Sequence, residues 1–164
     1  MTNLAGTVHG TLAALSILLG LLQFVWPKRG SGHRARGYAY VYGMILADAA
    51  ALTIYRFTGH FNILHVGAML NFVWIVLAMI PVLRSPRRPG WHIRHYYFIG
   101  WSYISLMSAG LTQLATRVVP VHSKQDVWMV IAAASLVTVT AGYVLIQRYR
   151  PDRTVPIVHE GAPS

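Results

Sequence analysis

Five apolar runs, separated by short polar or basic segments, dominate the chain. Each run has roughly the twenty residues that an α-helix needs to cross the hydrocarbon core of a bilayer. They cover about residues 7–26, 37–57, 62–83, 91–118 and 127–147. The pattern therefore predicts an all-α fold, a polytopic membrane helix bundle of five transmembrane helices.

The last run differs from the other four because it has no histidine and no charge between its ends. We expect it to be a peripheral helix beside a four-helix core. Residues 1–149 would then form one transmembrane domain. Residues 150–164 are rich in proline and polar side chains, and this composition predicts a disordered cytoplasmic tail.

Composition agrees with a membrane protein. Hydrophobic residues make up 55% of the chain and charged residues only 11%, which is unlike a water-soluble domain of this size. The absence of cysteine excludes disulfides and thiolate metal sites, so histidine would have to carry any metal chemistry. The net charge of +10 comes from short loops between apolar runs, so we do not expect nucleic acid as a partner.

The basic residues predict the orientation of the chain. Eleven lie in segments on one side of the predicted membrane: Lys28, Arg29, Arg34, Arg36, Arg84, Arg87, Arg88, Arg94, Arg148, Arg150 and Arg153. Three lie on the other: Arg56, Arg117 and Lys124. Because cytoplasmic loops are enriched in Lys and Arg, five spans place the N-terminus outside and the C-terminus in the cytoplasm. The expected location is the bacterial inner (cytoplasmic) membrane, with the lipid bilayer as the first partner.

The fourth run, residues 91–118, has one polar and small face. Its members recur at helical spacing: His95, Ser102, Ala109, Gln113 and Thr116. Exposing such a polar face to lipid would cost free energy, so we expect it to pack against other helices. The opposite side should meet lipid, with Ile99, Ile104, Leu111 and Leu114.

A second polar feature should lie deeper in the bundle. Asp48 is the only acidic residue inside an apolar run, and it either acts chemically or joins helices by hydrogen bonding. At a rise of about 1.5 Å per residue, Asp48, Asn71 and Ser108 fall at a similar depth. The predicted polar layer consists of Ser16, Asp48, Asn71, Ser108 and Gln113.

Four histidines lie near the ends of the first four runs. His9 and His65 share the outer side, whereas His33 and His95 share the cytoplasmic side. Alternate helices of an up-down bundle are diagonal neighbours, so each pair could face across the interior. Two such pairs suit bis-histidine ligation of haem b, as in a di-haem-like membrane electron carrier. Its partner would be a membrane redox protein or a quinone.

Two other interpretations remain open at this point. The outer imidazoles of His9, His60 and His65 could hold zinc or copper in a metal-dependent membrane hydrolase, with His122 nearby. Alternatively, the polar faces only join helices, and the chain is a non-enzymatic accessory or interaction protein. Histidine near a helix end is also common as an interfacial residue. The sequence does not decide whether the chain is an enzyme, and it assigns no oligomeric state.

Several of these residues resemble a known family over about residues 8–118. The resemblance consists of His9, His33-Arg34 with Gly37, Phe61 with His65, and Trp91, His95 and Trp101-Ser102-Tyr103 followed by Arg117. It is to the bacterial membrane family called domain of unknown function 2306, a name that implies no activity. Gln113 stands where the resemblance leads us to expect a glutamate, so a hydrogen-bonding role fits this position better than a titrating one.

Overall fold

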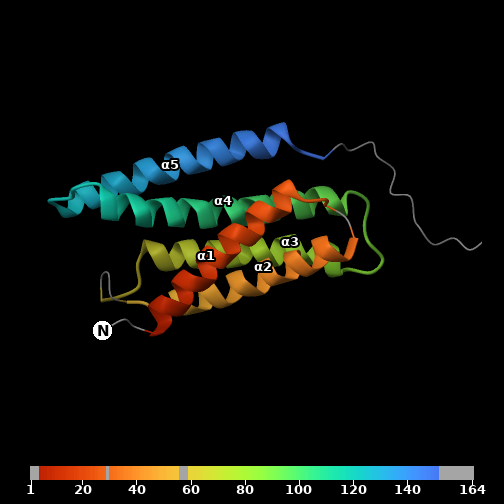
Figure 1. The fold of residues 1–164 in the computed structure, drawn as a ribbon, viewed down its shortest axis with the longest axis horizontal. Helices are drawn as coiled ribbons and strands as arrows, with labels where there is room; N and C mark the ends of the chain where they lie inside the picture. Colours follow the sequence, from red (N-terminus) through yellow and green to blue (C-terminus); the bar gives the residue numbers. More distant parts are fainter. Residues whose placement is uncertain (1–3, 29, 56–58, 152–164) are drawn as a thin grey trace, which may run out of the picture.

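Five helices form the fold in a computed structural model, which describes residues 4–28, 30–55 and 59–151. They are α1 (Leu4–Val25), α2 (Gly30–Ala51), α3 (Ile63–Leu83), α4 (Trp91–Val118) and α5 (Lys124–Arg148) (Figure 1). All regular secondary structure in the described ranges is helical, which confirms the predicted all-α class.

The helices run up and down in chain order. α1 packs on α2, α2 on α3, and α3 on α4, while a smaller contact between α4 and α1 closes the four-helix core. α5 packs on α4 and lies outside that core (Figure 1). α1 and α3 are therefore diagonal neighbours running in one direction, and α2 and α4 are diagonal neighbours running in the other.

The two ends of the bundle differ in charge. We call the end with the α1–α2 and α3–α4 connections the basic end; its described cations are Lys28, Arg34, Arg36, Arg84, Arg87, Arg88, Arg94, Arg148 and Arg150. The opposite end has Arg117 and Lys124. Arg29, Arg56, Arg153 and residues 152–164 of the predicted tail lie outside the described residues.

Most helix boundaries match the apolar runs, and α2 is the exception. It begins at Gly30 and ends at Ala51, whereas the sequence predicted about residues 37–57. The polar residues from His33 to Arg36 continue the helix beyond its apolar part, which the hydrophobic pattern cannot show. The backbone after Ala51 turns at once, with the amides of Thr53 and Ile54 bonded three residues back.

Local sequence explains the starts of two other helices. Asn62 caps α3, its side chain accepting from the Leu64 amide, and His65 completes a capping box. Ser123 and Asp126 form the same device at the start of α5. α3 includes Pro81 and ends at Leu83, the predicted end of the third run.

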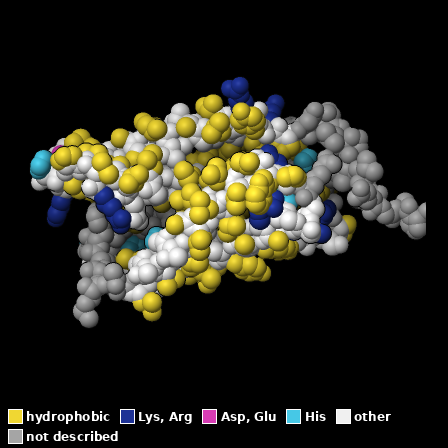
Figure 2. Space-filling view, in the orientation of Figure 1, with side chains coloured by type: hydrophobic (Ala, Val, Ile, Leu, Met, Phe, Trp, Pro, Cys, Tyr) yellow, Lys and Arg dark blue, Asp and Glu magenta, His cyan; other side chains and the backbone are white. Residues whose placement is uncertain are grey.

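Three helices are long and apolar enough to cross a membrane: α1, α3 and α5. α2 and α4 contain more polar and basic residues and fall short of that apolar character, so the five-span topology remains a prediction. Hydrophobic side chains cover much of the face in Figure 2, and large ones such as Leu18, Leu21 and Leu136 are more than half exposed. Such a surface suits contact with lipid.

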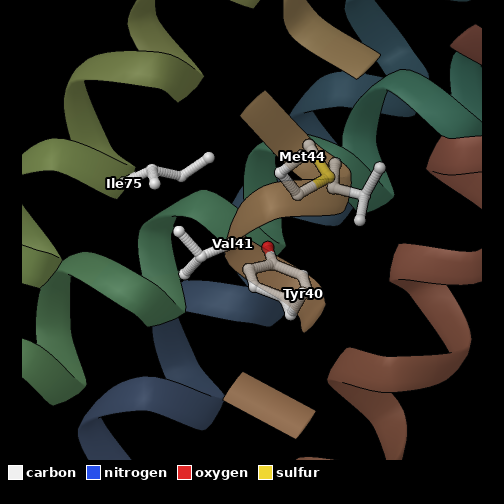
Figure 3. Packing of buried hydrophobic residues seen from close by; sticks show 5 residues of the cluster. Tyr40, Val41, Met44 and Ile75 are labelled. Atoms are coloured by element: carbon white, nitrogen blue, oxygen red, sulfur yellow. The ribbon is translucent and has the colours of Figure 1, made fainter. Parts of the chain in front are cut away.

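A compact hydrophobic cluster holds the core together. Tyr40, Val41 and Met44 of α2 pack with Ile75 of α3 and Leu106 of α4 (Figure 3). Ile104 was expected to meet lipid, but it is buried beneath α5, where it lies against Gly142. Ile104 is buried because α4 is covered on two sides, by the core and by α5.

Candidate functional site at the basic end

His33 and His95 lie on the diagonal helices α2 and α4, and a hydrogen bond deeper in the core sets their relative depth. The phenol of Tyr40 and the hydroxyl of Ser102 are 3.0 Å apart. Tyr40 follows His33 by seven residues, and Ser102 follows His95 by the same interval. Because α2 and α4 run in the same direction, equal intervals from one contact place both histidines at the same depth, about 10 Å away.

Each of these histidines is held through its Nδ1 atom. His95 Nδ1 lies 3.0 Å from the carbonyl oxygen of Ala78 on α3. A carbonyl can only accept, so Nδ1 carries the proton and Nε2 presents its lone pair. His33 Nδ1 lies 3.0 Å from Oε1 of Gln23, whose Nε2 donates to the His33 carbonyl oxygen. Both imidazoles therefore have the tautomer that ligating histidines adopt, with Nδ1–H engaged by a neighbouring acceptor.

The two outer histidines, His9 and His65, differ from each other in tautomer. His9 Nδ1 lies 2.9 Å from the carbonyl oxygen of Ala47, so His9 has the same tautomer as His33 and His95. His65 Nδ1 instead accepts from the Asn62 amide at 3.2 Å, which puts the imidazole proton on Nε2. That Nε2 is buried and has no hydrogen-bond partner among the described residues. His65 is 2% exposed, and its ring stacks with two aromatic rings, those of Tyr55 at 4.8 Å and Phe61 at 5.1 Å.

The depths of His9 and His65 follow from their neighbours. His9 contacts Ala47, which precedes Asp48, and Asp48 bonds Asn71 of α3. Asn71 lies six residues beyond His65, or about 9 Å along α3. His9 thus lies near the depth of the Asp48–Asn71 pair, and His65 lies closer to the start of α3.

Part of the predicted polar layer comes together in the core. Asn71 Nδ2 donates to Asp48 Oδ2 at 2.8 Å, and both side chains are buried. Ser16 is fully buried, and its Oγ lies beside Gly43. Ser16 Oγ and Asn71 Oδ1 have no partner among the described residues. Ser108 is half-buried.

Gln113 does not belong to this layer, because its side chain is exposed. Ala109, on the same face of α4, is exposed as well. The reason is the path of α1, which crosses the bundle diagonally and lies away from α4 at the end opposite the basic one (Figure 1). α1 therefore covers the face that includes Ser102 near the middle of α4 and leaves this face exposed near the C-terminal end of α4.

The alternative metal ligands do not converge in this conformation. Within residues 4–28, 30–55 and 59–151, no three histidine or acidic side chains lie close enough together to hold one ion. His60 and His122 are exposed in the connections at the opposite end from His33 and His95.

Sequence reasoning missed Tyr40 as a site residue and did not connect Gln23 to His33. The sequence could have indicated Tyr40, because it follows His33 by seven residues, the same interval as that between His95 and Ser102. Gln23 lies on the same helical face as Ser16, which already predicted an inward position.

Comparison with known proteins identifies a family. The family described as "Predicted membrane protein (DUF2306)" matches residues 6–149. No curated protein and no solved structure matches the chain.

Proposed function

We propose a function for this chain on the premise that it belongs to the DUF2306 family of predicted membrane proteins, a description that assigns no activity. The proposal is a small membrane cytochrome that binds haem b through His33 and His95 at the basic end. The observation that supports it is the pair of diagonal imidazoles at one depth, each with Nδ1 engaged and Nε2 available.

The donor set fits haem b. Bis-histidine haems take two neutral imidazole nitrogens from facing helices, and acceptors at Nδ1 orient the rings and raise their basicity. Ala78 O and Gln23 Oε1 are such acceptors, and both come from helices adjacent to the ligand helix. When bound, haem would supply a one-electron couple, and the partner would be a membrane redox protein or a quinone.

The protein's own residues would tune such a site by position and charge. Lys28 and Arg36 lie within five residues of His33 at the basic end, so the surroundings are cationic and suit the carboxylates of a haem. The Tyr40–Ser102 bond would hold α2 and α4 at a constant register beneath the ligands. Ala78 and Gln23 would keep each imidazole from rotating.

A second haem between His9 and His65, as the sequence led us to expect, finds weaker support. His9 has the ligating tautomer, but His65 would have to release the Asn62 amide before its Nε2 could bind iron as a neutral imidazole. We therefore place the proposed haem at the basic end.

The proposed topology has all five helices in the cytoplasmic membrane, with the basic end in the cytoplasm. α2 packs beside α1 and α3, and α4 packs beside α3 (Figure 1), so a bilayer crossed by α1 and α3 would enclose them too. The excess of Lys and Arg at the basic end favours the cytoplasmic side for that end.

A second candidate function is supported by the same hydrogen bonds. His9 joins α1 to α2, His33 joins α2 to α1, and His95 joins α4 to α3. In this interpretation the imidazoles only connect helices, and the chain is a membrane accessory or interaction protein.

A visible absorption spectrum of the full chain distinguishes the two functions. The protein would be expressed with added haem precursor, purified in detergent and analysed for haem and for metal ions. A Soret band that is lost in His33→Ala and in His95→Ala, and retained in the exposed-loop variant His122→Ala, supports the cytochrome. Haem-free wild-type protein would support the accessory function instead, and a Soret band unchanged in both variants would exclude His33 and His95 as the haem ligands.

A further inference from the structure

A cavity of about 140 Å³ lies between α3 and α4 at the basic end. Three arginines line it: Arg84 at the end of α3, Arg88 in the connection, and Arg94 in the first turn of α4. The rest of the wall is largely apolar, with Leu77 and Ile80 from α3 and Phe98 from α4. The cavity thus combines a cationic rim with a hydrophobic floor.

The arginines share this cavity without a compensating carboxylate among the described residues. Of the two described acidic residues, Asp48 bonds Asn71 in the core, and Asp126 bonds Ser123 at the opposite end. Three arginine side chains that line one small cavity repel one another, and an anion relieves that repulsion. A phosphate is the anion whose oxygens best match the paired N–H groups of arginine.

The position of the cavity favours a phosphate attached to a lipid. Ile80 lines the cavity and is still 51% exposed, so the floor continues onto the apolar outer surface of the bundle. Leu83 extends that surface and is 66% exposed. Trp91 also lines the cavity, with Arg87 stacked over its ring at 4.4 Å, and tryptophan and arginine are typical of the headgroup level of a membrane.

We propose that this cavity binds an anionic phospholipid, with its phosphate between Arg84, Arg88 and Arg94 and an acyl chain along Ile80. Basic pockets between membrane helices are a recurrent form of headgroup recognition. The lipid would connect the end of α3 to the start of α4. This inference concerns a different site from the proposed haem and does not rest on it.

The test is native mass spectrometry of the full chain in a mild detergent, titrated with phosphatidylglycerol. Parallel titrations use phosphatidylcholine of the same acyl chains and inorganic phosphate as a competitor. The variants are Arg84→Gln, Arg88→Gln, Arg94→Gln and the triple substitution. Arg148→Gln is the matched control, because it removes a charge at the same end outside the cavity. Helical circular dichroism before and after heating checks that each variant is folded.

We expect wild type and Arg148→Gln to bind phosphatidylglycerol equally, with about fivefold weaker binding for each cavity arginine removed. Arg94→Lys keeps the charge without the planar fork, so it should recover part of the loss. Three results would overturn the proposal: a folded triple variant that binds like wild type, equal binding of phosphatidylcholine, or displacement of the lipid by millimolar inorganic phosphate, which would indicate a free-anion site.

Discussion

Tyr40 and Ser102 meet across the core at 3.0 Å, hydroxyl to hydroxyl, from helices that are not adjacent in the bundle. Both side chains are buried, so neither hydroxyl can exchange this partner for water. The bond sets the relative height of α2 and α4, and with it the heights of His33 and His95 seven residues away. The geometry of the candidate ligand pair is thus determined by a contact two helical turns from it.

Tyr40→Phe should therefore destabilise the fold while preserving its shape. The substitution leaves the Ser102 hydroxyl buried without a partner, which costs about 1 kcal/mol. Thermal unfolding in detergent, followed by circular dichroism, measures the change. Tyr42→Phe is the control, since Tyr42 is 63% exposed and should show no change. In a double-mutant cycle, Ser102→Ala should add little to Tyr40→Phe; fully additive losses would show that the hydroxyls do not interact.

A close approach of α1 to α4 predicts a second stability effect. A Cβ atom on Gly20 would overlap the ring of Tyr103. That ring is held by a bond of 3.2 Å from its hydroxyl to the Ile17 carbonyl oxygen, and it packs against Phe24 and Tyr40. It therefore cannot move without disturbing the core.

Gly20→Ala should destabilise the protein by about 1–3 kcal/mol through overpacking. Gly10→Ala on the same helix is the matched control, because nothing lies within 4 Å of its added methyl group. The control should be neutral or slightly stabilising, since alanine has the higher helix propensity. Equal melting temperatures for the two variants would contradict the close approach of Tyr103.

The sequence predicted the helices better than their contacts, for physical reasons that particular residues illustrate. α4 has the predicted bounds because Gly90 precedes it and Pro120 follows it, and both limit helices. α2 was placed seven residues too late because its basic first turns have no hydrophobic signal.

In the candidate site, too, the sequence predicted positions along a helix better than contacts between helices. Helical periodicity placed Ser102 inside, where it is buried, but it also placed Gln113 inside, because a single helix gives no information about the tilt of its neighbour α1. The contrast between His65 and the other histidines depends on which atom each Nδ1 faces. Such contacts arise only after the helices pack, so no spacing in the chain reveals them.

The Asp48–Asn71 bond predicts an asymmetric pair of substitutions. Asp48→Asn keeps an oxygen that accepts from Asn71 Nδ2, so the melting temperature should change little. Asn71→Leu removes the only described partner of the buried Asp48 side chain and should cost about 2 kcal/mol. Thermal unfolding in detergent compares the two. If Asp48→Asn were the more damaging variant, the carboxyl group itself would be required for the fold, and hydrogen bonding between helices would not explain its position.

The positive charge at the basic end predicts which parts of the chain face the cytoplasm. The natural sequence contains no cysteine, so single substitutions report position without a background signal. Ser85 lies in the exposed α3–α4 connection at the basic end, and His122 lies exposed between α4 and α5 at the other. With α4 crossing the bilayer between them, Ser85→Cys and His122→Cys must fall on opposite faces. A membrane-impermeant maleimide applied to intact cells should label His122→Cys, whereas Ser85→Cys should react only after the membrane is opened. Labelling of both from outside would mean that α4 does not cross the membrane, and labelling of Ser85→Cys alone would invert the topology and place the arginine-lined cavity on the outer face.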